Sequence, residues 1–381
     1  MTNFNFKFLG AWLVIVASIT GLQAQNDFTL KGKDEMVPAG VWNDVNGEYI
    51  NAHGGGILLF DSKYYWFGEH RPAKGFSTEV GVTCYSSTDL CNWRYEGVAL
   101  SVSEEAGNEI EKGCIMERPK VIYNKRTKKF VMWFHLELKG KGYEAARAGV
   151  AVSDSPTGPY CFVSSSRVCP GIFPLNMTEE ERDIQWNMEQ FEEWWTPEWR
   201  EAVNKGLFVK RDLEGGQMSR DMTLYVDDDG IAYHIYSSEE NLTLQIAELT
   251  DDYQGHSGKY VRLFPGGHNE APAIFKKDGT YWMITSGCTG WAPNEARMFS
   301  APSIWGPWTQ HPNPCVGPNR EITFGGQSTY ILKVEGRKDC FIFMGDIWRP
   351  EHPSDARYIW LPIQFKDGVP VVEWKDSWTL D

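Results

Sequence analysis

The chain has 381 residues, 42% of them hydrophobic and 14% aromatic, which is enough apolar material for the core of one large domain or two modest ones. Its net charge of −14, without any basic tract, argues against nucleic acid or an anionic membrane surface as a partner. Neutral ligands are therefore expected. The 17 Trp and 16 Tyr residues supply flat faces that suit sugar rings as well as core packing.

The N-terminal segment is typical of an exported protein. Lys7 precedes an apolar run over residues 8–22, and Ala24 provides a small-residue exit; this pattern predicts a cleavable signal peptide over residues 1–24. The run is too short to span a membrane, and no later stretch approaches the roughly 20 apolar residues that a span requires. We therefore expect a periplasmic or secreted protein with no membrane partner.

The eight cysteines are scattered along the chain and lack the CxxC pairs of a zinc site. Cys84 with Cys91, and Cys161 with Cys169, are close enough in sequence to form disulfides, whereas buried free cysteine is the common state in a protein with a large core. The cysteines therefore predict no metal site, and the sequence leaves their pairing open.

Five segments of the chain share one pattern: a polar residue, a run of aliphatic and β-branched residues, a turn, and a second strand rich in aromatic residues. Polar and glycine residues at the turns, such as Asp278-Gly279, predict that each segment is a β-hairpin. The polar residues that lead the five hairpins are His53, Glu117, Asp221, Glu270 and Gln327.

A further pair of short strands follows the hairpins, which gives about four strands per repeat. Long helical patterns are absent from these units, so the sequence predicts an all-β, five-bladed propeller over residues 25–381. The first strand of every blade would run along the central channel, and the five lead residues would meet at one end of it. Three of them are acids, so at least one should keep its proton near neutral pH and be able to act as a general acid.

An insertion of about residues 172–216, between the second and third repeats, breaks the strand rhythm. Thr178 followed by Glu180 and Glu181 resembles a helix start, and the spacing of Ile184, Met188, Phe191 and Trp195 predicts a helix or two. Two interpretations of its tryptophans remain open. They either form a wall beside the channel mouth that shapes a sugar subsite, or hold the insertion against the propeller: Trp186, Trp194, Trp195 and Trp199.

Several motifs, in this order and spacing, resemble glycoside hydrolase family 43, and more closely its branch of exo-β-1,3-galactanases. They are AHGGG from Ala52, GEH from Gly68, CYSSTDL, ERPKVIYN, SRDMTLYVDDDG, EAPAIFK, SGCTGWAPN and GGQSTYIL. The resemblance covers the chain from about Ile50 to Trp360. It implies a five-bladed propeller and glycosidic hydrolysis with inversion of configuration.

The resemblance also implies roles for single residues. Glu270 matches the general acid, and Asp221 matches the acidic residue that orients that acid and tunes its pKa. Most of the family carries an Asp base at the head of the first blade, where this chain has Asn51-Ala52-His53. The galactanase branch shares this loss and places a Gln at the head of the last blade, which Gln327 matches.

In that branch the Gln is thought to act as base, as an imidic acid, while a Glu matched by Glu117 binds sugar and water. A neutral amide is a poor proton acceptor, so the chemistry alone nominates Glu117 as base and Gln327 as the group that positions water. Both possibilities stay open at this point. Glu69 of the GEH motif would contact sugar hydroxyls.

Three further features have two interpretations each. His53 either holds water or a cation in the channel or satisfies backbone groups, and Trp291 either stacks on sugar or packs in the core. The DDDG run at residues 227–230 resembles part of a calcium loop, but turn chemistry explains it better. No cofactor is expected to be required, and a structural calcium ion in the central channel is the one candidate.

The sequence therefore predicts a monomeric, exo-acting enzyme that releases galactose from β-1,3-galactan, such as the backbone of arabinogalactan. The alternative enzyme is an α-L-arabinofuranosidase or related exo-glycosidase, because loop changes exchange substrates in this family. The non-enzymatic alternative is a carbohydrate-binding propeller, which is suggested by the missing Asp at the head of the first blade.

Overall fold

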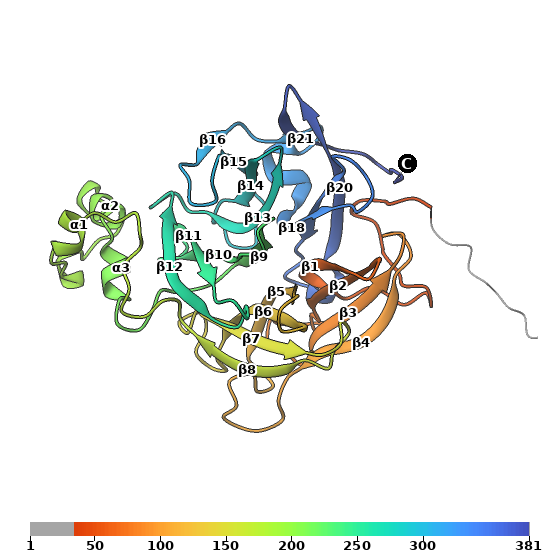
Figure 1. Cartoon of the computed structure of the whole chain (residues 1–381), viewed down its shortest axis with the longest axis horizontal. Helices are drawn as coiled ribbons and strands as arrows, with labels where there is room; N and C mark the ends of the chain where they lie inside the picture. Colours follow the sequence, from red (N-terminus) through yellow and green to blue (C-terminus); the bar gives the residue numbers. More distant parts are fainter. Residues whose placement is uncertain (1–33, 381) are drawn as a thin grey trace, which may run out of the picture. The chain divides into compact units, whose positions relative to one another are not determined.

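The computed structural model describes residues 34–380, and residues Gly32–Asp381 form one compact unit. Four sheets of four strands and one sheet of five strands are arranged as the blades of a propeller (Figure 1). The first strands of the blades contact one another in ring order, so they surround the central channel. The predicted all-β, five-bladed propeller is confirmed.

Each blade is an antiparallel meander whose strands follow one another in the sequence. Blade 1 contains β1 (His53–Phe60), β2 (Lys63–Glu69), β3 (Gly81–Ser87) and β4 (Arg94–Ser101). Blade 2 contains β5 (Ile115–Asn124), β6 (Lys129–Glu137), β7 (Arg147–Ser153) and β8 (Cys161–Ser166). Blade 3 contains β9 (Met222–Val226), β10 (Ala232–Ser238), β11 (Thr243–Leu249) and β12 (His256–Leu263).

The last two blades complete the ring. Blade 4 contains β13 (Glu270–Lys277), β14 (Thr280–Ser286), β15 (Arg297–Ala301) and β16 (Thr309–His311). Blade 5 contains β18 (Gln327–Lys333), β19 (Phe341–Ile347), β20 (Arg357–Lys366) and β21 (Val369–Glu373), and β17 (Cys315–Val316) adds a parallel edge strand. Short 3₁₀ turns occur at Arg320–Gly325 and Pro353–Asp355.

The predicted hairpin turns lie at the ends of the first strands. β1 and β2 are joined by Asp61 and Ser62, with φ of 50° and 60°, and β13 and β14 by Asp278 and Gly279, with φ of 49° and 81°. Two consecutive left-handed residues make the tight turn whose twist matches antiparallel strands. The turns thus fix the register, and with it the end of the channel at which each first strand begins.

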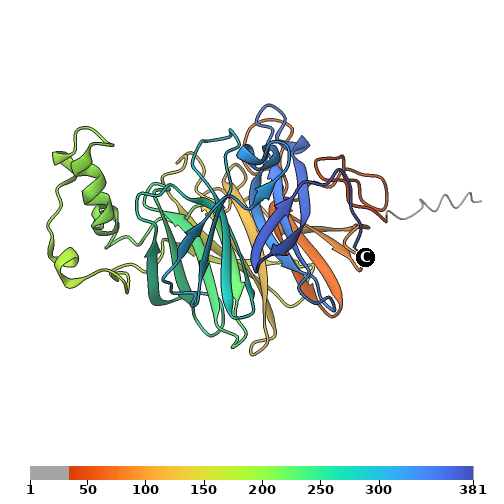
Figure 2. The ribbon, with the colours of Figure 1, turned by 90° about the horizontal axis from the view of Figure 1, so that it is seen from above.

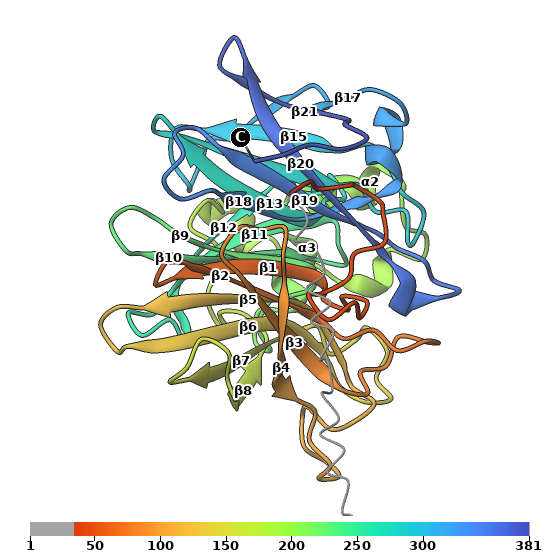
Figure 3. The same cartoon turned by 90° about the vertical axis from the view of Figure 1, so that its right-hand side faces the viewer.

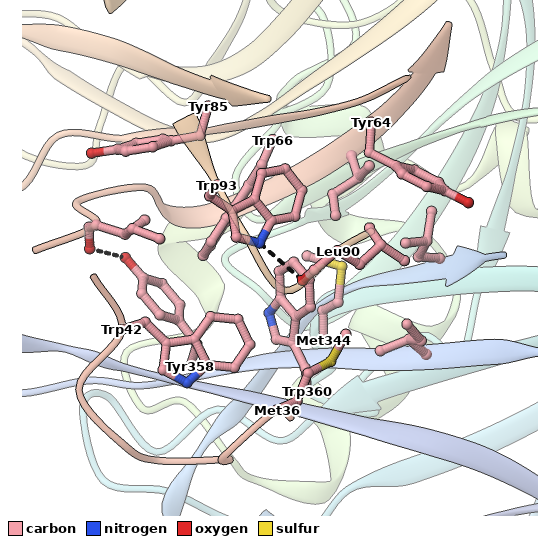
Figure 4. Close-up of a cluster of buried hydrophobic side chains, with 14 of the residues drawn as sticks. Met36, Trp42, Tyr64, Trp66, Tyr85, Leu90, Trp93, Met344, Tyr358 and Trp360 are labelled. Carbon is pink, nitrogen blue, oxygen red and sulfur yellow. Dashed lines mark hydrogen bonds between the residues drawn. The ribbon is translucent and has the colours of Figure 1, made fainter. Parts of the chain in front are cut away.

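Blades 1 and 5 lie side by side, and an aromatic cluster joins them (Figures 3 and 4). Trp66 of β2 is 1% exposed and lies 4.9 Å from the ring of Trp360 on β20, and Trp42 packs 5.0 Å from the same ring. Met36 and Trp378 add a backbone bridge between the two ends of the described chain. The burial of aromatic side chains therefore closes the ring between blades 1 and 5, which share no β-sheet.

The insertion between blades 2 and 3 is helical, as predicted, but its helices are shorter than the spacing indicated. α1 (Glu179–Asp183), α2 (Pro197–Asn204) and α3 (Leu207–Arg211) lie beside blade 3 (Figures 1 and 2). The predicted capping box is present, because Thr178 and Glu181 bond each other's backbone. The residues whose spacing predicted a helix or two, Ile184 to Trp195, contain only a 3₁₀ turn at Met188–Gln190, because α1 already ends at Asp183.

Several further sequence predictions concern the N-terminal segment, the cysteines, the DDDG run and membrane spans. The signal peptide over residues 1–24 lies outside the described residues. Cys84, Cys161 and Cys169 are free thiols, so neither candidate disulfide forms. The DDDG run forms a hairpin turn in which Asp227 pairs with Lys276. Within residues 34–380, no helix has the length and apolar character needed to cross a bilayer.

Candidate active site

A cavity of about 390 Å³ lies at the end of the channel where β5, β13 and β18 begin. All five blades contribute side chains to it. Its lining comprises Arg71, Phe76, Glu117, Arg118, His135, Tyr143, Arg220, Asp221, Asn241, Glu270, Gly290, Trp291, Gln327 and Trp348. A larger cavity, of about 1000 Å³, lies at the opposite ends of these strands among hairpin turns and aliphatic side chains, and none of the predicted site residues lines it.

Irregular backbone at the start of the first strands turns the lead residues toward the cavity. The pairing register between the first two strands of a blade shifts just after Glu117 in blade 2 and just after Glu270 in blade 4. The next residues, Arg118 and Ala271, have φ of 55° and 52°, and Gly54 has the equivalent conformation after His53 with φ of 60°. Such β-bulges re-aim side chains at active sites, and the left-handed backbone of Arg118 is strain that the surrounding contacts must hold.

Five of the predicted residues line the cavity together: Glu117, Asp221, Glu270, Gln327 and Trp291. The other two do not. Glu69 is 3% exposed and lies behind Arg71, whose Nη2 is 2.6 Å from Glu69 Oε2. His53 is fully buried, and its ring stacks 5.2 Å from that of Tyr358 between blades 1 and 5. Neither side chain is placed to contact a ligand in the cavity.

Glu270 opens β13 at the cavity wall. Asn241 Nδ2 donates to its Oε1 at 2.6 Å. Burial and the carboxylate of Asp221 together raise the pKa of Glu270 to about 7, against the opposing charge of Arg118. A carboxyl with this pKa keeps its proton in a large fraction of molecules at neutral pH and can donate it.

Glu117 has the opposite electrostatic environment. Its Oε1 accepts from Arg71 Nη2 and Tyr143 Oη, both at 3.1 Å, and its Oε2 lies 3.2 Å from His135 Nδ1. Burial alone would raise the pKa of Glu117, but His135 and the charges of Arg71 and Arg118 outweigh it and lower the pKa to about 2. Glu117 is therefore an ionised carboxylate at the cavity.

Arg118 connects the remaining polar groups. Its Nε and Nη2 pair with the two carboxylate oxygens of Asp221, at 3.1 and 2.8 Å. Nη2 also donates to Gln327 Oε1 at 2.5 Å, and Nη1 donates to the carbonyl of Ser328 at 3.0 Å. A planar guanidinium holds both acceptors in fixed directions, which an ammonium group would not do.

The amide of Gln327 has a partner at each end. Its Oε1 accepts from Arg118 and, at 2.8 Å, from Trp348 Nε1, and its Nε2 donates to Ser286 Oγ at 2.9 Å. Arg and Trp side chains can only donate hydrogen bonds, so the atom that faces both is the carbonyl oxygen. This pattern fixes the orientation of the amide.

An aromatic wall, formed by Phe76, Trp291 and Trp348, borders the cavity. The rings of Phe76 and Trp291 stack at 4.6 Å, and Trp291 meets Trp348 edge-on at 5.9 Å. Arg71 lies 5.3 Å from the Trp348 ring. Trp291 is 38% exposed, so it presents a free surface to a ligand and is not a core residue.

Sequence reasoning missed Arg71, Arg118, Tyr143, Asn241 and Trp348. Arg118 carried a signal, since an arginine directly after the lead Glu117 stands in a strand whose flanking residues are mainly apolar. The other four lie outside the repeated hairpin pattern, in loops or at strand ends whose path depends on the assembled ring.

The polar core beneath the cavity does not fit a calcium ion. Lys120, which is 2% exposed, donates to the carbonyls of Gly54 and Arg118 at 2.9 and 3.3 Å, and Asp346 accepts from the Gly54 N–H at 2.6 Å. The amino group of Lys120 thus uses the carbonyl oxygens that a calcium ion would need as ligands. Over residues 34–380, no three His, Cys, Asp or Glu side chains are arranged to hold an ion.

The fold and the site together define a class of protein. A protonated carboxyl, an ionised carboxylate and a wall of aromatic rings meet in a cavity at the end of a propeller channel, and paired carboxyl groups of unequal pKa are the equipment of glycosidases. Comparison with known proteins gives the family.

The family model for glycosyl hydrolases family 43 matches residues 186–370. A solved family 43 β-1,3-galactosidase, in complex with galactodeoxynojirimycin, is 68% identical with a TM-score of 0.89, over 91% of this chain and 100% of that one. An exo-β-1,3-galactanase from Phanerochaete chrysosporium, solved with β-1,3-galactotriose, is 32% identical with a TM-score of 0.71, over 91% of this chain and 68% of that one. The chain belongs to glycoside hydrolase family 43.

A curated relative is more distant. The β-D-galactofuranosidase xynD of Aspergillus niger is 28% identical over 129 residues, and the match spans 31% of this chain and 37% of that protein. The shared segment is too short to carry a substrate from that relative to this chain.

Proposed function

We propose that this chain is an exo-acting galactan 1,3-β-galactosidase that releases galactose from β-1,3-galactan with inversion of configuration. The observation that carries the proposal is Glu270, a carboxyl with a pKa near 7 in a cavity to which all five blades contribute. The substrate follows the solved relatives, a β-1,3-galactosidase and an exo-β-1,3-galactanase, which match nine-tenths of the chain. These relatives favour galactan over an arabinofuranoside.

In the proposed reaction, Glu270 gives its proton to the glycosidic oxygen while the bond from that oxygen to the anomeric carbon breaks. A water molecule forms the new bond to the anomeric carbon from the opposite face, and its proton passes to a base. Asp221 keeps the proton on Glu270 by its negative charge and is itself held by Arg118. The aromatic wall would stack on the sugar.

The hydrogen bonds around Gln327 support Glu117 as the base. An imidic acid would carry a proton on Oε1, where Arg118 and Trp348 already donate. Glu117 is ionised and lines the same cavity. Gln327 then acts by positioning water and sugar, with its amide held in one orientation.

Galactose release tests the proposed reaction. We expect the wild-type protein to release only galactose from β-1,3-galactan, and Glu270→Gln to lower kcat/KM about 10²–10⁴-fold, the usual contribution of a general acid. Glu189→Gln, in the exposed 3₁₀ turn of the insertion, is the control for removing a carboxylate. Wild-type activity in Glu270→Gln would contradict the assignment of the acid.

Rescue by azide distinguishes the two candidate bases. Azide is a small anion that can enter the space left by a carboxylate and attack the anomeric carbon without general-base help. We expect azide to restore turnover in Glu117→Ala, with an α-galactosyl azide as product, and not in Gln327→Ala. Rescue of Gln327→Ala alone would make Gln327 the base.

Export, and a monomeric state in solution, remain predictions from the sequence. N-terminal sequencing of the mature protein in the culture fraction tests the first, and sedimentation tests the second.

A further inference from the structure

The helical insertion is tied directly to the acid side of the cavity. The turn between β10 and β11 contains Glu239, Glu240 and Asn241, three consecutive residues with left-handed backbone at φ of 52°, 59° and 62°. Asn241 donates to Glu270, and the next residue, Leu242, is buried in the apolar core of the insertion. One short segment therefore contacts both the acid and the insertion.

Ion pairs strengthen this connection. Glu240 bridges Arg211, at the end of α3, and Arg220, which lines the cavity, at 2.8 and 3.2 Å. Glu239, fully buried, pairs with Arg262 of β12 at 2.7 Å. Arg262 also donates to the carbonyls of the last residues of α2, Val203 and Asn204, at 2.9 and 3.0 Å. The insertion is thus held in a defined place beside blade 3.

The tryptophans of the insertion divide into two sets. Trp199 is 1% exposed and forms the insertion's core, with Trp186 packed against it. Trp194 and Trp195 are 41% and 47% exposed. Trp195 has a φ of 77°, an outlier for a bulky residue. Its ring lies 5.0 Å from that of His268, which is two residues before Glu270.

An exo-acting enzyme needs a path for the rest of its polymer. In the proposed reaction the terminal galactose fills the cavity. The next sugar of the chain, which is the leaving group, lies beside the acid that protonates the glycosidic oxygen. Two contacts connect the acid with the insertion: Asn241 donates to Glu270, and the ring of Trp195 lies against that of His268, two residues before Glu270 in the sequence. Figure 1 shows the helices on the outer side of blade 3, away from the channel.

We propose that the exposed rings of Trp194 and Trp195, together with Arg200, form a binding surface for the galactan chain on the leaving-group side of the cleaved bond. This surface is called the outer platform here. Galactose units would stack their C–H faces on the indole rings, and Arg200, which lies 5.5 Å from the Trp195 ring, would donate to hydroxyl groups. The inference rests on the proposed function, because it assumes that a galactan chain is the substrate.

The dependence of activity on chain length tests the outer platform. For the wild type, kcat/KM should be higher for β-1,3-galactohexaose than for β-1,3-galactobiose. Trp195→Ala and the double variant Trp194→Ala/Trp195→Ala should lower this ratio about threefold to tenfold, the range expected for losing aromatic stacking, and Trp195→Phe should retain most of it. Tyr95→Ala, which removes a ring that is 42% exposed on blade 1, is the matched control.

Binding measurements keep the test independent of turnover. In the Glu270→Gln background, calorimetry with galactohexaose should show a threefold to tenfold loss of affinity when Trp194 is replaced by Ala, a change outside the strained Trp195 backbone. Arg200→Ala should weaken binding too, but Arg200 Nε also donates to the Trp195 carbonyl at 3.1 Å, so Trp194→Ala is the cleaner variant. A variant that is active and folded but keeps the wild-type ratio of kcat/KM values for the hexaose and the biose overturns the outer platform. A variant whose oligomeric state changes while this ratio stays the same also overturns it. Failure of the proposed function is distinct, since the wild type would then release no galactose at any chain length, and the outer platform would fail with it.

Discussion

Glu270 and Glu117 are two carboxyl groups of one cavity whose pKa values are moved in opposite directions. Burial and Asp221 raise the pKa of Glu270 to about 7, whereas His135, Arg71 and Arg118 overcome burial and hold the pKa of Glu117 at about 2. Titratable pairs separated in this way supply one group that gives a proton and one that stays charged. The asymmetry comes from which side chains the bulged strands bring beside each acid.

Asp221 should set the alkaline limb of the pH profile. In Asp221→Asn the negative charge that raises the pKa of Glu270 is lost and Arg118 is left unpaired, so both changes lower that pKa. Since the acid acts in its protonated form, the fall of kcat/KM with rising pH should move to lower pH. At a pH above the pKa, a pKa that is lower by about 1 leaves roughly one-tenth of the protonated acid. A pH series of kcat/KM on galactobiose measures it.

An unchanged alkaline limb in Asp221→Asn would show that Asp221 acts on geometry alone. Asp154→Asn serves as control, because this surface carboxylate has a side chain that is 83% exposed.

At the level of single residues, the sequence predicted those that the repeat positions and could not predict those that packing positions. Glu117, Asp221, Glu270 and Gln327 line the cavity because each leads a hairpin of similar length. Tyr143 and Trp348 carry no such periodic mark. His53 leads its hairpin too, yet its ring turns to Tyr358, because Gly54 lets the chain pass close to Glu69 and Asp346.

The bulge after the lead residue is an element-level feature that recurs in three blades. Gly54, Arg118 and Ala271 share a left-handed backbone at the same position of β1, β5 and β13. An alternation pattern cannot reveal an inserted residue of this kind, because it leaves the hydrophobic residues of the strand in place. The strands were therefore predictable, whereas the direction of their first side chains was not.

In the insertion, by contrast, the bounds of the elements themselves could not be predicted. Apolar residues at helical spacing from Ile184 to Trp195 predicted a helix or two, but α1 ends before them at Asp183 and α2 begins after them at Pro197. A proline at the first turn of α2, with Thr196 as its cap, starts a new helix. Tertiary contacts with blade 3, and not periodicity, decide where these helices end.

Arg262 should be the main attachment of the insertion to blade 3. Arg262→Met leaves Glu239 buried without its cation and removes donors from the last carbonyls of α2. We expect a loss of about 3–5 kcal/mol in the free energy of unfolding, as for other broken buried ion pairs. Urea denaturation measures it, with Arg126→Met, at an exposed site, as the control.

Adding Glu239→Gln to Arg262→Met should restore part of the loss, because no buried charge then remains. Equal stability of Arg262→Met and the Arg126 control would rule out this role for the pair.

At the level of the whole molecule, the propeller converts a sequence repeat into a site. Five hairpins that lie far apart in the sequence begin at one end of the channel, and each blade contributes to the cavity. The period of the repeat predicted this ring. Its closure between blades 1 and 5 was not predictable, since it depends on Trp42, Trp66 and Trp360 meeting across the gap.

Proton NMR of the first products released from β-1,3-galactotriose tests most directly whether these residues form a single-displacement site for galactan. Water that attacks opposite the leaving group must yield α-galactose first, before mutarotation produces the β anomer. Early α-galactose, absent in Glu270→Gln, is the expected result. Early β-galactose, or no galactose from the trisaccharide, would contradict the mechanism in the first case and the function in the second.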